Sequence, residues 1–254
     1  MFKRLCSLQP IEVYKSANEM LEGWFGFNRQ ASSAIIKQFE FNPKEFLYYR
    51  NRAITADVPN ENGDCFERKE LLASYPTFIG KGIFYNHASD DPNNSFGVIL
   101  DANFVQPAGK NAYVELLGAI DRRLAEQKHP GLVRRIETGM LSGTSMGCLA
   151  GAAKCGICGN YATSLESLCD HMNPDSTGYV KGKLINASNN QYGFEYNYNI
   201  TFIEDSIVDT PADHTAQIFE VFASNKDKLD PQNPSKEVID TLVSALNAMA
   251  RNIK

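Results

Sequence analysis

The sequence lacks a basic run, a long apolar run and a secretory leader, and each absence narrows the range of functions. Its 25 lysines and arginines are outnumbered by 30 aspartates and glutamates, for a net charge of -5. This balance argues against a broad phosphate-binding face and against nucleic acid as the main partner. No apolar run approaches the ~18 residues of a membrane-spanning helix, and the opening segment is too weakly apolar for a secretory signal. We expect a protein of the cytoplasm with no membrane partner.

The chain is long enough and apolar enough to build a substantial core. It has 254 residues, 43% of them hydrophobic, which suits one large domain or two small ones. The expected organisation is an N-terminal helical segment at 1–43, a main domain at 44–223, and a linker with a C-terminal amphipathic helix at 224–254. A capping box predicts the first helix, and a stripe of apolar residues predicts the last.

Within the main domain, the residue patterns predict strands and two helices. Apolar residues at helical spacing predict a helix from Asn111 up to a stop at His129-Pro130, and LVRRIET at 132–138 predicts a short second one. Strands do not alternate regularly with helices, which disfavours a doubly wound parallel sheet. The expected fold is therefore α+β, with a mostly antiparallel sheet or barrel surrounded by helices. Aromatic and β-branched runs bounded by turn formers predict strands at 45–58, 77–87, 96–106, 140–150 and 194–208.

The stretch GTSMG frames Ser145 with glycines, and it admits more than one interpretation. It matches the nucleophile elbow of α/β hydrolases, but no helix-forming sequence follows it and the βα rhythm is missing. In a strand, side chains alternate, so Gly143, Ser145 and Gly147 share a face. The absent side chains would leave room for a peptide backbone to approach the hydroxyl. A small-residue strand packed closely against a helix is the structural alternative.

A reactive serine needs a base within hydrogen-bond reach and an acid that orients the base. Four histidines are available. His129 precedes a proline and is expected to be solvated, His171 belongs to a cysteine cluster, and His214 lies in a predicted turn. His87 is the best candidate, because it ends an apolar strand and precedes a flexible polar loop. A purely structural histidine at that strand end is the alternative.

Two neighbouring carboxylates in the last predicted strand are candidates for the acid. Glu204 and Asp205 are expected on opposite faces. Strict alternation places Glu204 on the side of Phe202 and Val208, where it would be partly desolvated and would need a partner. That favours Glu204 modestly, since Asp205 also has apolar neighbours.

Five stretches of the chain, spread over roughly residues 46–222, together carry a family resemblance. They are TADVPNENGDCF, TFIGKGIFYNHASDDPNNSFGVILDANF, YVELLGAIDRRL, IETGMLSGTSMGC and FIEDSIVDTPADHTAQIFEV. In this order they resemble the prohead maturation proteases of tailed bacteriophages. The catalytic fold of that family is shared with the herpesvirus capsid assembly proteases.

The resemblance implies a serine endopeptidase with His87 as base and Ser145 as nucleophile. The herpesvirus enzymes use a second histidine as third member; many phage sequences carry an acid on the matching strand, which here is Glu204. The family's oxyanion donor is a backbone N–H after that strand, which would place it near Ala212 and Asp213.

The resemblance also implies the partners and the place of action. The substrates would be scaffold, major capsid and portal proteins inside an immature phage head in the host cytoplasm, cut at short motifs usually bearing glutamate before the scissile bond. A homo-oligomer and self-cleavage are expected. Two other functions stay open: a non-catalytic head or tail component of related fold, and a zinc-dependent binding module in which the serine is incidental.

Four of the six cysteines fall between Cys148 and Cys169, a clustering that favours metal binding or reduced thiols over disulfides. Cys155, Cys158, Cys169 and His171 form CxxC, ten residues, then CxH, which can close a tetrahedral zinc site. Four protein ligands leave no position for water, so the metal is expected to be structural. It would contribute on the order of 10 kcal/mol to ordering a glycine-rich insertion at 148–190. Reduced thiols without metal are the alternative, and Cys148 is a possible substitute ligand.

Overall fold

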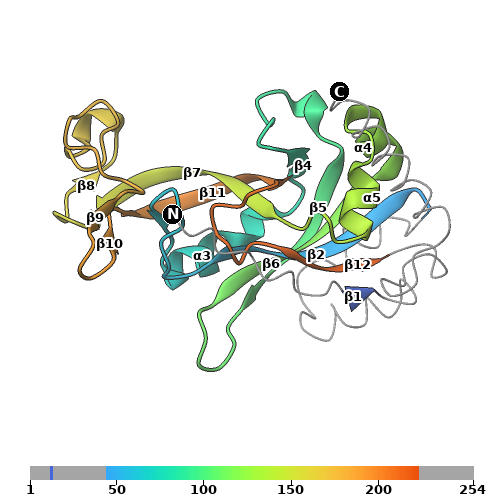
Figure 1. The fold of residues 1–254 in the computed structure, drawn as a ribbon, viewed down its shortest axis with the longest axis horizontal. Helices are drawn as coiled ribbons and strands as arrows, with labels where there is room; N and C mark the ends of the chain where they lie inside the picture. The colour runs from blue at the N-terminus through green and yellow to red at the C-terminus, as the bar shows by residue number, and fades with distance from the viewer. Residues whose placement is uncertain (1–11, 14–43, 223–254) are drawn as a thin grey trace, which may run out of the picture.

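The computed structural model describes residues 12–13 and 44–222, which form a mostly β-sheet structure with few helices (Figure 1). The helices are α3 (Arg68–Ser74), α4 (Arg122–Lys128) and α5 (Leu132–Glu137), with 3-10 turns η1 (Tyr75–Phe78), η2 (Pro92–Asn94) and η3 (Leu165–Ser167). The main sheet contains β1 (Glu12–Val13), β2 (Phe46–Thr55), β3 (Asp64–Cys65), β4 (Gly82–Tyr85), β5 (Gly97–Val105), β6 (Tyr113–Asp121), β7 (Thr144–Cys155), β8 (Tyr161–Ala162), β11 (Glu195–Ile207) and β12 (Ile218–Phe222). A separate pair comprises β9 (Leu184–Asn186) and β10 (Gln191–Tyr192).

The main sheet is open, so the expectation of a barrel is corrected. Its strands follow the order β1-β12-β2-β6-β5-β4-β11-β7-β8, and β3 pairs with β11 off this path. Most neighbours are antiparallel, as expected, but β1 with β12, β3 with β11, and β4 with β11 are parallel. The order places β4, β11 and β7 next to one another, and this part of the sheet holds the candidate site.

The helix predicted from Asn111 to His129-Pro130 is correct only in its second half, which is α4, whereas Tyr113–Asp121 form strand β6. Every residue from Val114 to Ile120 is buried, since β6 lies between β2 and β5. A strand covered on both faces is apolar at nearly every position, and such a run also satisfies helical spacing. Gly118 fits this arrangement, because a Cβ there would lie 2.5 Å from the ring of Tyr49 on β2.

The other secondary-structure elements predicted within the described residues are confirmed in whole or in part. The strands at 45–58, 96–106 and 194–208 and the helix at 132–138 are confirmed as β2, β5, β11 and α5. Part of 77–87 is instead taken by η1, and only Gly82–Tyr85 is strand. The strand expected at 140–150 begins at Thr144 and continues to Cys155, so the insertion starts after Cys155 rather than at 148. The helices expected before residue 44 and after residue 223 lie outside the described residues.

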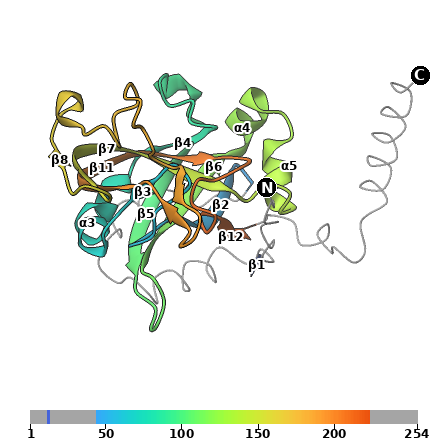
Figure 2. The same cartoon turned by 60° about the vertical axis from the view of Figure 1, so that its left-hand side comes forward.

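Strands β7 and β11 form a long ribbon that links two regions of the molecule. The segment 156–193 stands at one end of this ribbon, and α4 and α5 lie beyond the other (Figures 1 and 2). At its base the ribbon is anchored in the core, where the Phe202 ring stacks on Phe78 with centroids 3.8 Å apart. Within the described part of the chain, no helix is long and apolar enough to span a bilayer.

Candidate active site

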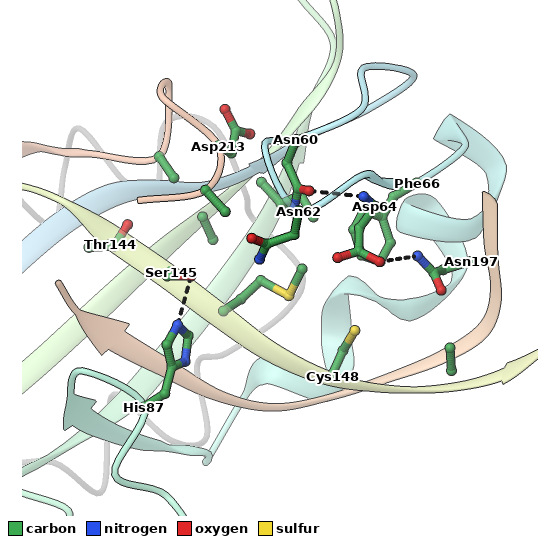
Figure 3. A pocket seen from close by; sticks show the side chains of 16 residues that line it. Asn60, Asn62, Asp64, Phe66, His87, Thr144, Ser145, Cys148, Asn197 and Asp213 are labelled. Carbon is green, nitrogen blue, oxygen red and sulfur yellow. Dashed lines mark hydrogen bonds between the residues drawn. The ribbon is translucent and has the colours of Figure 1, made fainter. Parts of the chain in front are cut away.

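The structure brings His87, Ser145 and Glu204 into one hydrogen-bonded chain. Nε2 of His87 lies 3.0 Å from Oγ of Ser145 (Figure 3), and its Nδ1 lies 2.7 Å from Oε1 of Glu204. The three residues come from the turn after β4, from β7 and from β11, which are neighbours in the sheet. Both distances suit proton transfer from a nucleophile to an oriented base. The proximity predicted from the sequence is therefore observed.

His87 is aimed by an unusual turn. Asn86 and His87 both adopt left-handed backbone conformations, with φ of 49° and 60°, which cost roughly 1–2 kcal/mol each for residues with a Cβ. Two hydrogen bonds to β11 hold the turn: Asn86 N donates to the carbonyl of Ile207 at 3.0 Å, and His87 N donates to Oγ of Ser206 at 3.2 Å. The strain is used to place the imidazole beside β11 and β7.

Glu204 is almost fully buried and is held at both oxygens. Its Oε2 accepts a 2.5 Å hydrogen bond from Oγ of Ser206, while Oε1 faces His87. Ser206 thus contacts both the acid and the backbone of the base. Sequence reasoning missed this residue, although its position two residues after Glu204 on one strand is the signal that could have found it.

Glu204 lies on the opposite face of β11 from the one that strict alternation predicts. Cys148 pairs with Phe202, but the next residue back on β7, Gly147, pairs with Glu204, so one extra residue bulges out at Ile203. Paired residues share a face of the sheet, and Glu204 therefore faces away from the side of Phe202. It lies with Gly147 on the face of Ser145.

The glycines beside Ser145 also serve a different purpose from the one expected. A Cβ at Gly147 would lie 2.6 Å from Oε1 of Glu204, and one at Gly143 would lie 2.5 Å from the carbonyl oxygen of Val208. Real Cβ atoms do not approach other atoms so closely. The absent side chains make room for the candidate acid and for the end of β11, not for an incoming peptide.

The surroundings of His87 stabilise the protonated form of its imidazole. The hydrogen bond to Glu204 raises the pKa of His87, and partial desolvation of the ring opposes that rise. A carboxylate at Nδ1 leaves Nε2 of the neutral ring as the acceptor that faces Ser145, and it stabilises the imidazolium after proton transfer.

Behind the serine strand lies a buried polar cluster that the sequence did not reveal. Nδ2 of Asn51 donates to Thr144 Oγ1 at 2.9 Å and to Asp205 Oδ2 at 3.1 Å, and Tyr49 OH donates to the same Asp205 oxygen at 3.2 Å. Burial, and next the charge of Glu204, raise the pKa of Asp205 well above its usual range. Thr144 precedes Ser145, so the cluster ties the serine strand to β2.

Ser145 and His87 open into a cavity of about 260 Å³ (Figure 3). Ala212 and Asp213, the predicted oxyanion loop, line the same cavity. This loop is fixed, because the Ala212 carbonyl accepts from Glu61 N at 3.0 Å and Asp213 Oδ2 accepts from Thr55 N at 2.9 Å. The cavity's remaining polar wall consists of Asn60, Asn62, Asp64, Thr144 and Asn197.

One edge of β7 is unpaired beside this cavity. β11 pairs along one side of β7, whereas β8 pairs with the other side only at Ala153 and Lys154. Among the described strands, none covers the stretch between Ser145 and Ala152 on that side. An unpaired strand edge is a template for an extended peptide.

The other two histidines outside the cysteine cluster have different surroundings. The ring of His129 lies 4.8 Å from Tyr85 and 5.6 Å from Phe96, and burial lowers its pKa, so this side chain is partly buried rather than fully solvated. His214 is exposed, with Nε2 2.7 Å from Oε1 of Glu61. Neither contacts Ser145.

The predicted metal ligands also meet. The ligand atoms of Cys155, Cys158, Cys169 and His171 all lie within 4.8 Å of one another. Sγ of Cys155 and of Cys169 lie 3.8 and 3.9 Å from Nδ1 of His171, close to the ~3.5–3.8 Å between ligands of a tetrahedral zinc ion. The donor set and spacing therefore fit a metal ion.

The turn around these thiols supports ligation. The N–H groups of Ile157 and Cys158 donate to Sγ of Cys155, at 3.3 and 3.5 Å. The pKa of Cys158 is lowered to about 7, mainly by a hydrogen bond from the backbone N–H of Asn160. Burial raises the pKa of Cys169 to about 11. A bound cation would favour the thiolate form of both. Cys148 lies outside the group and instead lines the serine cavity.

Comparison with known proteins adds little to this geometry. No family model matches the chain, and no curated protein matches it. Among solved structures, the crystal structure of KSHV protease in complex with a hexapeptide phosphonate inhibitor matches with a TM-score of 0.34 and 14% sequence identity. The match covers 68% of this chain and 64% of that chain, less than two thirds of its length. The function must therefore be argued from the site itself.

Proposed function

We propose that the protein is a serine endopeptidase that uses His87, Ser145 and Glu204. The observation that carries the proposal is the continuous contact from Glu204 through His87 to Ser145, made at a cavity and beside an unpaired strand edge. A histidine with a purely structural role would not need a nucleophile at one nitrogen and a buried carboxylate at the other.

The reaction follows from these contacts. Nε2 of His87 takes the hydroxyl proton as Oγ of Ser145 bonds to the peptide carbonyl carbon, and Glu204 stabilises the resulting imidazolium. Backbone N–H groups of the loop at Ala212 and Asp213 are the proposed donors to the oxyanion. His87 then gives its proton to the departing amine as the C–N bond breaks. Water, deprotonated by the same imidazole, then bonds to the acyl carbon. The C–Oγ bond breaks as His87 returns the proton to Oγ of Ser145, which releases the acid product.

We further propose a biological role in phage procapsid maturation, with a fold related to the herpesvirus capsid assembly proteases. Five ordered stretches of the sequence support this role. Scaffold, major capsid and portal proteins are the proposed substrates, the immature head in the host cytoplasm is the proposed location, and a homo-oligomer is the proposed active form.

A structural zinc ion at Cys155, Cys158, Cys169 and His171 completes the proposal. When bound, it would cross-link the end of β7 to the segment 156–193. Cys155 is ten residues beyond Ser145 on one strand, about 33 Å along an extended chain, so the metal takes no part in the reaction.

The decisive experiment compares wild-type protein with Ser145→Ala on co-produced scaffold, capsid and portal proteins. Loss of a triad nucleophile reduces kcat about 10⁶-fold, so the variant should produce no fragments. A fluorophosphonate probe should add its mass to Ser145 of the wild type and not to the His87→Ala variant. Equal digestion by wild type and Ser145→Ala would refute the serine mechanism, and an intact substrate with both would favour a structural role.

A further inference from the structure

A second cavity, of about 390 Å³, lies farther along β7. Its walls are β7 itself from Ala150 to Ala153 and the Cys-rich segment around Leu165 and Met172. Leu165 is 78% exposed at its rim, whereas Met172 is 3% exposed inside. The remaining wall combines apolar and polar residues. The apolar ones are Ala162, Leu168, Pro174 and Tyr179, and the polar ones are Thr163, Ser164, Lys181, Glu195 and Asn197.

The second cavity borders the serine cavity. Ala150 and Asn197 line both, and Figure 3 shows Ser145 and Asn197 toward opposite ends of the first cavity. The unpaired edge of β7 runs along both of them. A polypeptide that leaves the serine along this edge therefore enters the second cavity directly.

The spacing along β7 fixes which part of such a polypeptide reaches the second cavity. Ala150 and Ala153 are five and eight residues beyond Ser145. Paired strands advance together by about 3.3 Å per residue, so the occupying side chain lies about five to eight residues from the scissile bond. The backbone edge is unpaired as far as Ala152, because β8 pairs with β7 only from Ala153 on.

The charges at the junction of the cavities indicate which side chains are accepted. Nζ of Lys181 lies 2.7 Å from Oδ1 of Asp64 and 2.5 Å from Oε1 of Glu195. The two carboxylates outnumber the one ammonium group, so this partly buried site carries an excess of negative charge. An acidic side chain would be repelled there, whereas an aliphatic or aromatic one gains from leaving water.

We propose that this second cavity is a substrate subsite that the Cys-rich segment adds to the protease. It binds an apolar side chain of the substrate about five to eight residues from the bond that is cut. The inference rests on the proposed function, because it takes the occupant to be the polypeptide held at Ser145. The metal cluster then has a functional consequence, since it holds one wall of the subsite in place.

The test uses full-length protein and peptides built around a mapped cleavage site. One peptide has four residues on each side of the scissile bond, and two others are extended to ten residues on one side or the other. Extension on one side should raise kcat/KM about tenfold when a leucine occupies one of the positions five to eight. Aspartate at the same position should abolish the gain.

Variants locate the effect in the cavity. Leu165→Asp, at the exposed rim, and Thr163→Trp, which fills the cavity from its surface, should each remove the gain for the long peptide relative to the short one. Leu184→Asp is the matched control, because Leu184 is an exposed apolar residue of the same segment that lines neither cavity. It should leave the ratio of long-peptide to short-peptide kcat/KM unchanged.

The possible results separate this inference from the proposed function. If neither extension raises kcat/KM, or if the gain persists in both cavity variants, the subsite is refuted while the protease stands. If no peptide is cut by wild-type protein, the proposed function fails. In that case, binding of a labelled long peptide to wild type but not to Leu165→Asp would still support the subsite, and equal binding would overturn it.

Discussion

The Gly147→Ala substitution tests the coupling between the candidate acid and base with a single methyl group. The added Cβ would lie 2.6 Å from Oε1 and 2.8 Å from Cγ of Glu204. The carboxylate has little room to retreat, because it is 1% exposed and its other oxygen is bound to Ser206. The oxygen that must move is the one that contacts His87.

Two magnitudes follow from this geometry. Overpacking of this kind costs about 1–3 kcal/mol of unfolding free energy, which a folded domain can tolerate. Failure to orient the base costs about 10⁴-fold in kcat when the acid is neutralised outright, so a displaced acid should cost roughly 10²–10⁴-fold. The pKa of His87 should also fall toward its ordinary value, because the hydrogen bond that its ring donates to Glu204 is what raises it.

The assay measures kcat against pH on a short peptide, with the melting temperature as a check of folding. Gly156→Ala is a matched control: its Cβ would lie 2.6 Å from the Phe194 ring, an overlap of the same size just beyond the far end of β7. It should lose stability but keep kcat. A folded Gly147→Ala protein with kcat within about threefold of wild type and an unchanged pH profile would refute the role given to Glu204.

Three further predictions follow from the charges and ligands. Glu204→Gln should lower kcat by about 10³–10⁴-fold. Only neutral His87 acts as base and Glu204 raises the pKa of His87, so the acid limb of the pH–rate profile should move to lower pH in this variant. An unmoved limb would contradict the contact between Glu204 and His87. Metal analysis should find one zinc per chain, and Cys158→Ser or a chelator should release it. Loss of the metal should expose 156–193 to an added protease, while cleavage of a short peptide by Ser145 continues. If that cleavage stops in a chain that is still folded, the metal takes part in the reaction. Asp205→Asn should gain stability relative to wild type as pH rises. Burial raises the pKa of Asp205 in the folded protein above its value in the unfolded chain, so the wild type loses stability as pH increases through the folded pKa. Asparagine does not titrate, so the variant does not lose this stability. Urea unfolding at pH 5 and 8 measures this difference, and a pH-independent difference would show that Asp205 ionises without cost.

Several features of the site could be predicted from local sequence. The CxxC and CxH spacing brings ligands together within two short turns, so little of that geometry depends on the rest of the fold. Aromatic and β-branched runs predicted β2, β5 and β11. The choice of His87 with Ser145 drew on the resemblance as well, because 58 positions separate them and no local pattern links them.

Other features were decided only by tertiary structure. β6 has a helical spacing of apolar residues, and it is a strand because β2 and β5 cover both its edges and its faces are buried. The bulge at Ile203 reverses the face that alternation assigns to Glu204. The positions of the glycines around Ser145 are explained by Glu204 and Val208, because a side chain at either glycine would overlap one of these residues.

The physical reason is the range of the interactions. Periodicity, capping and ligand spacing act over a few residues, and the sequence alone therefore determined most strands and the cluster of cysteines and histidine that could hold a metal ion. Burial, strand register and strand edges depend on segments far apart in the chain; Glu204 and His87, for example, are separated by 117 positions. Only the folded sheet could decide which carboxylate meets the imidazole, what fills the space beside the serine, and where an unpaired edge leads into a second cavity.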